Sequence, residues 1–262
     1  MNSNSEPPAT RIVFITGATA GFGKACADKF AAHGYDLIIN GRRSDRLQQL
    51  ADEIEGKYNV AVLQLPFDVR DEKAVSDSIK GLPDEWKKMD VLVNNAGLAA
   101  GRDYFEEASL DDWNIMIDTN VKGFLYVAKA VSELMAKQGH GHIINMGSIA
   151  GKEVYEKGNV YCATKFAVDA LSQSMRIDLL RHGIKVTAIN PGAAETEFSL
   201  VRFKGDEETA KKIYEGLQPL TAEDVAEVVF YCTTLPAHVC INDLSITCLQ
   251  QASTIYFNRK SG

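Results

Sequence analysis

The chain has 262 residues, 45% of them hydrophobic, which is enough for the buried core of one large α/β domain. Its net charge of −7 leaves no broad basic surface, so neither nucleic acid nor anionic lipid is an expected partner. No apolar run approaches the roughly 20 residues of a membrane span. The five cysteines form no Cys-x-x-Cys pair, which favours reduced thiols and a cytoplasmic protein.

Metal-binding and targeting patterns are both absent from the sequence. His140 and His142 have no third ligand at metal-binding spacing, so we expect no catalytic metal. Residues 1–10 are polar and proline-containing, without the basic start and apolar centre of a signal peptide, which predicts a disordered tail. We expect one continuous domain over residues 11–250, followed by a C-terminal tail over residues 251–262.

Short apolar, β-branched runs alternate with amphipathic helical patterns over residues 11–190. The predicted strands cover residues 11–16, 36–40, 60–65, 89–93, 142–146 and 185–190, and the predicted helices 24–33, 44–58, 71–82, 111–136 and 159–182. Gly183 should end the last helix in a left-handed conformation. The alternation predicts a Rossmann-like α/β fold, in which a doubly wound parallel sheet carries helices on both faces.

A glycine-rich turn at residues 17–23 separates the first strand from the first helix. Glycines allow a sharp turn and a close approach to a pyrophosphate, and the free N–H groups of the helix N-terminus can bind phosphate. The spacing G-x-x-x-G-x-G differs from the more general G-x-G-x-x-G pattern. Arg42 and Arg43 follow the second strand, where an acidic residue would select NAD and an arginine can bind the 2′-phosphate of NADP. We therefore expect NADP; the alternative is that both arginines are surface residues at a loop.

The carboxyl ends of the later strands carry polar and small residues. Asp68 follows the third strand and is placed to meet an adenine amino group, and Asn94-Asn95-Ala96-Gly97 ends the fourth. Ligands collect at this edge of an open α/β sheet. Tyr161 and Lys165 lie four residues apart in a helical pattern and so share a face, where a cation can favour phenolate. The pair is a candidate acid/base device, although the same spacing also occurs by chance on exposed helices.

Taken together, these motifs resemble the short-chain dehydrogenase/reductase family. The matching residues occur in the family's order: Thr16-Gly17-x-x-x-Gly21-x-Gly23, Asp68, Asn94-Asn95-Ala96-Gly97, Asn120, Ser148, Tyr161-x-x-x-Lys165, Pro191-Gly192 and Thr196. Further stretches, among them 116–120, 201–206 and 234–238, resemble the NADP-dependent 3-hydroxy acid dehydrogenases that act on serine-like compounds, and the sulfoacetaldehyde reductases. The chain departs from both groups at residues 152–157, where their loop is more apolar.

The resemblance implies a set of functional residues. The implied catalytic residues are Asn120, Ser148, Tyr161 and Lys165. The implied cofactor-binding residues are Gly17, Thr19, Ala20, Gly21, Phe22, Gly23, Arg42, Arg43, Asp68, Val69, Asn95, Ala96, Gly97, Tyr161, Lys165, Pro191, Gly192 and Thr196. The implied substrate-binding residues are Ser148, Tyr155, Tyr161 and Arg202, with a substrate lid at about 193–218.

The resemblance also implies a mechanism. Ser148 would donate a hydrogen bond to the substrate oxygen, Tyr161 would transfer the proton, and hydride would pass between the substrate carbon and the nicotinamide. Lys165 would hold the ribose and lower the pKa of the phenol, and Asn120 would position a water. The expected substrate is a small acidic hydroxy compound or its carbonyl form, and Arg202 is expected to bind its acidic group. The alternative is that Arg202 is a solvated lid residue paired with Glu207 or Glu208.

Two other functions remain open at this stage: a non-catalytic NADP-binding regulatory protein, and a reductase of larger apolar carbonyl compounds. The resemblance further implies a homotetramer. The C-terminal tail, with Tyr256 and Phe257, is expected to reach the active site of a neighbouring subunit.

Overall fold

Seven parallel strands form one sheet in the order β3-β2-β1-β4-β5-β6-β7 in the computed structural model, which describes residues 11–259. The strands are β1 (Ile12–Ile15), β2 (Asp36–Gly41), β3 (Val62–Pro66), β4 (Val91–Asn94), β5 (Gly141–Met146), β6 (Ile184–Pro191) and β7 (Asp243–Ile246). The chain order reverses between β1 and β4, which is the topological switch point where doubly wound folds bind ligands. The fold expected from the sequence is confirmed. The tail expected at residues 1–10 and the last three residues lie outside the described residues.

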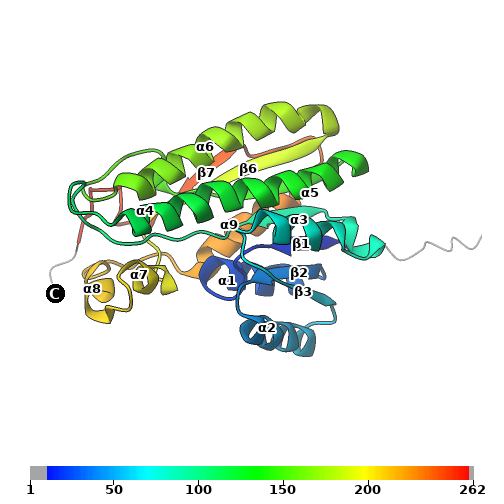
Figure 1. Cartoon of the computed structure of the whole chain (residues 1–262), viewed down its shortest axis with the longest axis horizontal. Helices are drawn as coiled ribbons and strands as arrows, with labels where there is room; N and C mark the ends of the chain where they lie inside the picture. Colours follow the sequence, from blue (N-terminus) through cyan, green and yellow to red (C-terminus); the bar gives the residue numbers. More distant parts are fainter. Residues whose placement is uncertain (1–10, 260–262) are drawn as a thin grey trace, which may run out of the picture.

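Helices cover both faces of the sheet (Figure 1). They are α1 (Gly21–Ala31), α2 (Ser44–Lys57), α3 (Glu72–Lys80), α4 (Leu110–Ile117), α5 (Phe124–Gln138), α6 (Asn159–Leu179), α7 (Glu197–Arg202), α8 (Glu207–Lys212) and α9 (Ala222–Thr234). Short turns of helix lie at Asp84–Lys87, Ile149–Gly151 and Leu180–His182, and a π-helical turn at Asp118–Gly123. No helix among residues 11–259 combines the length and the apolar character needed to cross a membrane.

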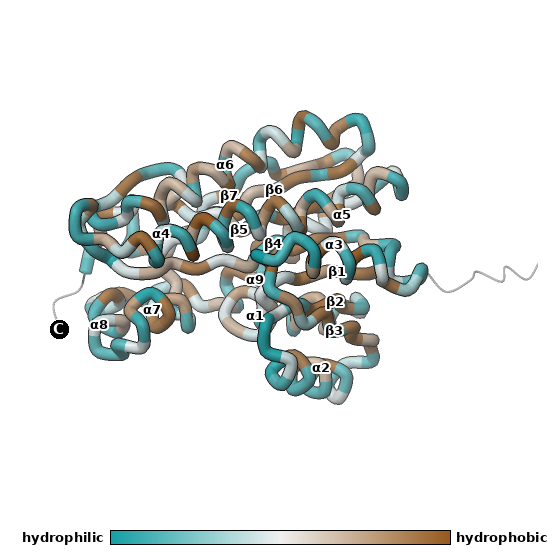
Figure 2. Tube along the Cα trace, in the orientation of Figure 1, coloured by the Kyte–Doolittle hydropathy of each residue, from teal (hydrophilic) through white to brown (hydrophobic). Residues whose placement is uncertain are grey.

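Alternate residues of each strand point to opposite faces of the sheet, and this alternation builds two cores. Val13 and Ile15 pack with residues of α1, α2 and α9 on one face. Ile12 and Phe14 pack with residues of α3 and α5 on the other. Figure 2 shows the strands mainly in the hydrophobic colour, whereas α2 and α8 carry much of the hydrophilic colour. The central strands are therefore buried on both sides, as a doubly wound sheet requires, whereas the edge strands β3 and β7 are partly exposed.

Helix ends agree in part with the sequence. Gly183 adopts the expected left-handed conformation (φ +67°) at the end of the turn Leu180–His182. Thr221 and Asp224 form a capping box that starts α9. The helical run expected over residues 111–136 is present from residue 110 to residue 138, but the π-helical turn Asp118–Gly123 divides it into α4 and α5. A π turn adds one residue to the helix without changing the apolar pattern enough to be seen in the sequence.

Four elements in the C-terminal half of the chain, α7, α8, α9 and β7, were not expected from the sequence. Strand β7 is only four residues long, lies at the edge of the sheet and pairs with β6 from Ala188↔Asp243 to Pro191↔Ile246. Helices α7 and α8 are short and lie together beyond the end of the sheet (Figure 1). Both belong to the segment 193–218 in which the sequence indicated a lid.

Candidate active site

A cavity of about 300 Å³ opens at the carboxyl ends of the central strands. Its wall contains every residue expected to bind the cofactor except Gly23: Gly17, Thr19, Ala20, Gly21, Phe22, Arg42, Arg43, Asp68, Val69, Asn95, Ala96, Gly97, Tyr161, Lys165, Pro191, Gly192 and Thr196. The structure thus brings together residues that span most of the chain. It adds several that sequence reasoning missed, among them Phe67, Leu98, Met146 and Phe198, which are apolar and carry no motif.

The glycine-rich turn is held by bonds from the end of β4. Gly17 has a φ of +63°, which L residues with a side chain rarely adopt. The amide nitrogen of Asn95 donates to Thr16 O at 2.8 Å, and Thr16 Oγ1 accepts from the backbone N–H groups of Asn95 and Ala96. A Cβ on Gly23 would lie 2.2 Å from Gly17 O, so Gly23 permits close packing of α1 against the turn and does not line the cavity.

Arg42 and Arg43 lie on the wall of this cavity and are exposed. Within residues 11–259, neither forms an ion pair with a carboxylate. Two unpaired guanidinium groups at the end of β2 fit a 2′-phosphate, because they offer bidentate donors and positive charge. The donor set of the cavity therefore fits NADP.

Asp68 is engaged in a way the sequence did not indicate. Its carboxylate accepts from Arg70 Nε at 3.0 Å and from Arg70 Nη2 at 2.6 Å. This hydrogen bonding is the main cause that lowers the pKa of Asp68, and the charge of Arg42 contributes to a smaller extent. The expected contact with an adenine amino group stays a prediction, and Asp68 would have to make it while bonded to Arg70.

Tyr161 and Lys165 project from α6 into the cavity and are both buried. Lys165 Nζ donates to Met146 O at 2.9 Å, and burial lowers the pKa of Lys165 to about 8. Burial raises the pKa of Tyr161, while the neighbouring Ser148 hydroxyl and the charge of Arg202 act to lower it. Lys165 Nζ lies 6.0 Å from the centre of the Tyr161 ring.

Ser148 and Asn120 are fixed by backbone contacts. Ser148 Oγ accepts from the N–H of Ala150 at 3.1 Å and donates to Pro191 O at 3.4 Å. Asn120 lies in the π-helical turn, where its amide accepts from the N–H of Leu98 at 2.8 Å and donates to Leu98 O at 2.7 Å. The expected role of Asn120 in positioning a water near Lys165 stays a prediction.

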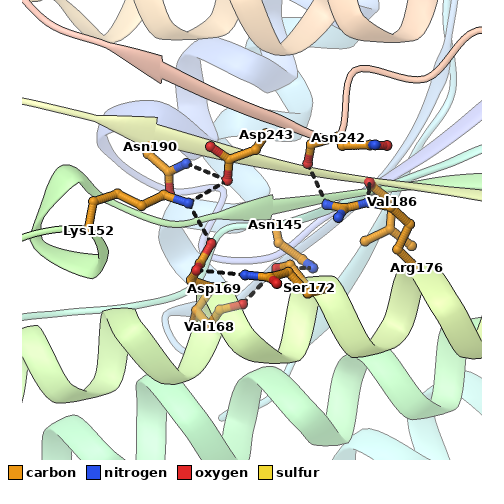
Figure 3. Close-up of polar contacts among 11 residues, drawn as sticks. Asn145, Lys152, Val168, Asp169, Ser172, Arg176, Val186, Asn190, Asn242 and Asp243 are labelled. Carbon is orange, nitrogen blue, oxygen red and sulfur yellow. Dashed lines mark hydrogen bonds and ion pairs between the residues drawn. The ribbon is translucent and has the colours of Figure 1, made fainter.

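A polar network centred on Lys152 connects the loop after Ser148 to α6 and β7 (Figure 3). Lys152 Nζ contacts Asp169 of α6 at 2.6 Å and Asp243 of β7 at 2.7 Å. Asp243 also accepts from Asn190 Nδ2 at 3.1 Å. Lys152 belongs to residues 152–157, where the sequence departs from the family pattern. Through these contacts it joins the loop to helix α6 and strand β7. The bonds are partly exposed, so the network aligns these elements more than it stabilises the fold.

A second, more open cavity of about 670 Å³ lies on the other side of Tyr161. Its wall contains all the residues expected to bind substrate: Ser148, Tyr155, Tyr161 and Arg202. The rest of the wall comes from Arg102 and Tyr104, from the loop after Ser148, from the 193–218 segment, and from the C-terminal residues Gln251, Thr254, Phe257 and Arg259. We call this cavity the substrate groove. Ser148 and Tyr161 line both cavities and therefore stand between them.

Arg202 is 8% exposed and faces the groove. Its Nη1 donates to Tyr155 Oη at 2.9 Å and its Nε to Gly101 O at 3.2 Å. The pairing with Glu207 or Glu208 that the sequence left open does not occur, because these carboxylates lie beside Lys211 and Lys212. A buried guanidinium bonded only to neutral oxygens keeps its full charge for an anion.

The C-terminal segment 251–259 packs along the substrate groove of its own chain. Thr254 donates from its N–H and its hydroxyl to Glu153, at 3.1 and 3.2 Å. Arg259 donates to the carbonyls of Ile213 and Glu215. The reach of this segment to a neighbouring subunit stays a prediction. Its place beside Tyr161 was missed because no local pattern links a chain end to a helix a hundred residues away.

Potential metal ligands and thiols do not cluster in the described chain. Residues 11–259 contain no group of three His, Cys, Asp or Glu side chains that could hold a metal ion. All five cysteines are free, and four of them are buried.

Comparison with known proteins agrees with this geometry. The model of the short chain dehydrogenase family matches residues 11–206. The chain is 48% identical to an NADP-dependent 3-hydroxy acid dehydrogenase of Escherichia coli (strain K12), over 92% of this chain and 96% of that protein. It is 46% identical to sulfoacetaldehyde reductase 2 of Chromohalobacter salexigens, over 92% and 95% of the two chains.

A solved structure is also similar. It is the closed form of a serine dehydrogenase complexed with NADP+, with a TM-score of 0.88 and 46% identity over 95% of this chain and all of that chain. The resemblance to 3-hydroxy acid dehydrogenases and sulfoacetaldehyde reductases inferred from the motifs is confirmed. The chain belongs to the short-chain dehydrogenase family.

Proposed function

We propose that the protein is an NADP(H)-dependent oxidoreductase that interconverts a small acidic hydroxy compound and its carbonyl form, of the 3-hydroxy acid or serine type or of the sulfoacetaldehyde type. The observation that carries the proposal is that Tyr161 and Ser148 line both a cavity with unpaired arginines and a groove with a buried arginine. The names of relatives that are 46–48% identical support it.

The residues of the chain divide the chemistry among them. When bound, NADP supplies the nicotinamide that accepts or gives a hydride. Ser148 holds the substrate oxygen, and Tyr161 takes its proton during oxidation or returns it during reduction. Lys165, buried and with a pKa near 8, supplies a positive charge beside the ribose and the phenol. Asn120 fixes the π-helical turn against Leu98 and so positions this wall.

Arg202 is the proposed receptor for the acidic group of the substrate. Its guanidinium is buried, faces the groove and bonds the hydroxyl of Tyr155 at 2.9 Å. A carboxylate or sulfonate can accept two parallel bonds from such a group, which lysine cannot reproduce. The 193–218 segment, which carries Arg202, is then the substrate lid, and Tyr155 adds a hydroxyl to the same anion.

The test is turnover of NADPH with sulfoacetaldehyde, a 3-oxo acid and a neutral aldehyde, and of NADP+ with serine, 3-hydroxypropionate and isethionate. We expect turnover of at least one acidic compound. NADPH binding without any turnover would instead favour a non-catalytic NADP-binding regulatory protein. A preference for long apolar ketones would favour a reductase of larger apolar carbonyl compounds.

Arg202→Ala sharpens this test. Loss of a charge-assisted contact should lower kcat/KM for the acidic substrate by about ten- to a hundredfold. Arg202→Lys keeps the positive charge but cannot donate two parallel hydrogen bonds, so it should recover only part of the lost kcat/KM. Lys211→Ala removes an exposed lysine of the same segment that does not line the groove, and serves as the matched control. An equal loss with a neutral aldehyde would mean that Arg202 only shapes the segment.

We also propose that the protein is a cytoplasmic homotetramer. Apolar side chains on α5, on α6 and on the turn that follows α6, namely Leu125, Phe166, Ile177 and Leu180, are exposed and offer a surface for a second copy. The five free thiols suit a reducing compartment. Sedimentation equilibrium tests the assembly, and a monomer at micromolar concentration would exclude it. Fluorescent fusions of the full chain test the location.

A further inference from the structure

The substrate groove is larger and more cationic than a single small acid requires. Its 670 Å³ lies in the range that proteins use for ligands much larger than serine. Five of the residues that line it are lysine or arginine, and only Glu156 is acidic. Arg202 serves the first acidic group in the proposed function. The charge that remains is therefore available to a second anion.

Two of these cations, Arg102 and Lys157, stand on the same aromatic wall as Arg202. The Tyr155 ring has the guanidinium of Arg202 at 5.6 Å from its centre and that of Arg102 at 6.0 Å. Lys157 Nζ lies 4.0 Å from the centre of the Tyr104 ring. The aromatic faces hold both cations at the groove without neutralising them. An extended substrate that places one anion at Arg202 can thus reach them with another.

Lys157 has a backbone conformation that lysine rarely adopts. Its φ is +62°, in the left-handed region, which costs free energy for any residue with a side chain. Within residues 11–259, neither Lys157 nor Arg102 has a carboxylate in ion-pair contact. The one acidic group of the groove, Glu156, accepts from Tyr104 Oη at 3.2 Å. A strained, partly buried lysine without an anionic partner points to a ligand that supplies the anion.

We propose that Arg102 and Lys157 form a second anion-binding site, and that the preferred substrate is a dianion: a hydroxy acid that carries a further carboxylate or sulfonate beyond the hydroxyl-bearing carbon. The inference rests on the proposed function and narrows its substrate class. The reaction itself is unchanged: the C–H electron pair leaves the carbon as hydride to NADP+, the O–H proton goes to Tyr161, and a C=O bond forms. The unusual sequence of residues 152–157 then serves substrate choice.

The first experiment compares two substrates of matched size. In 3-hydroxyglutarate one end carries a carboxylate where 3-hydroxypentanoate carries a methyl group, and both share the first acid and the hydroxyl. We expect kcat/KM for the dianion to exceed that for the monoanion by about tenfold or more. The advantage should shrink as salt rises from 0.05 to about 0.5 M, because the site is exposed. Equal values for the two compounds would overturn the inference.

The second experiment uses variants of the two cations. Arg102→Ala with Lys157→Gly should remove most of the advantage of 3-hydroxyglutarate and leave 3-hydroxypropionate within about twofold. Lys157→Gly alone should keep or raise the melting temperature, because glycine adopts a φ of +62° without strain. Lys211→Ala, outside the groove, is the matched control and should leave kcat/KM for both substrates unchanged. An equal loss of kcat/KM for both substrates in the double variant would show that the two cations have a structural role only.

The two proposals fail in different ways. If none of the hydroxy acids reduces NADP+, the proposed function is wrong. If 3-hydroxypropionate or serine is oxidised and 3-hydroxyglutarate has no advantage over 3-hydroxypentanoate, the proposed function stands and the second anion site is wrong.

Discussion

The two cavities that meet at Tyr161 are built in different ways. The first cavity, which fits the cofactor, lies on the ends of hydrogen-bonded strands, and partly buried bonds such as Asn95 Nδ2 to Thr16 O at 2.8 Å hold its turn. The substrate groove is assembled from short helices, loops and the C-terminal segment. Its walls carry exposed contacts, among them the 2.9 Å ion pair of Lys212 with Glu208.

The difference separates chemistry from selectivity. Buried bonds within the sheet cannot rearrange without loss of packing, so the cofactor cavity keeps one geometry. Exposed ion pairs contribute little to stability, so residues that line the groove can be substituted with little loss in the free energy of unfolding. Changes in the first cavity should therefore affect all substrates alike, and changes in the groove should act on some substrates only.

The largest effect is expected at the wall that both cavities share. Tyr161→Phe removes the transferable proton and should lower kcat by about a hundred- to ten-thousandfold for every substrate. NADPH binding, measured by fluorescence titration, should stay within about twofold. A variant that lost NADPH affinity to the same degree would assign Tyr161 to the cofactor cavity alone.

Lys165→Met should show a pH-dependent change in stability. Burial lowers the pKa of Lys165 to about 8, so below that pH the folded protein carries a buried charge that the unfolded chain holds in water. As pH rises from 8 to 10.5, the folded state loses its proton first, and the unfolding free energy gains roughly 3 kcal/mol from this group. The variant lacks this gain. Urea unfolding of both proteins at pH 7.5 and 10 measures the difference, and parallel curves would contradict it.

Arg42→Asp tests whether the first cavity reads the 2′-phosphate. The change should raise KM for NADPH by about ten- to a hundredfold and improve the use of NADH, with the same factor for each carbonyl substrate. Initial rates with both cofactors decide the matter. A wild-type protein that already prefers NADH would refute the role of Arg42 and Arg43.

Tyr155→Phe should give the smallest effect and the most selective one. It keeps the ring but loses the 2.9 Å bond to Arg202, so KM for an acidic substrate should rise by about three- to tenfold. A neutral aldehyde should be unaffected. If both substrates changed together, the groove would not be independent of the shared wall.

Residues that the sequence indicated for the cofactor come together in the first cavity because their signals are local. Strand ends, the glycine turn and Arg42 each follow a predicted strand, and parallel strands bring their ends to one edge. Gly23 is the exception, since a fingerprint position does not reveal whether a glycine faces the ligand or the helix packing.

The rest depended on contacts between distant segments. Strand β7 is short and half exposed, so its pattern is too weak to detect, yet Asp243 in it binds Lys152 91 residues away. Arg202 was found through the family pattern, whereas Arg102, Phe257 and Arg259 carry no motif. The packing of the chain end against the 193–218 segment brings Phe257 and Arg259 to the groove, and the loop after β4 brings Arg102.

The π-helical turn Asp118–Gly123 holds one residue more than a regular helix would between α4 and α5. Each residue of a regular helix turns the chain by about 100°. Because the wide turn absorbs the extra residue, deleting one residue here would leave a regular helix in which Val127, Val131 and Met135 still face the core. The deletion would instead shift Asn120 away from Leu98, so it would cost the site more than the fold. Insertions and deletions among related chains should therefore spare residues 118–123 and gather in the surface loops around the substrate groove.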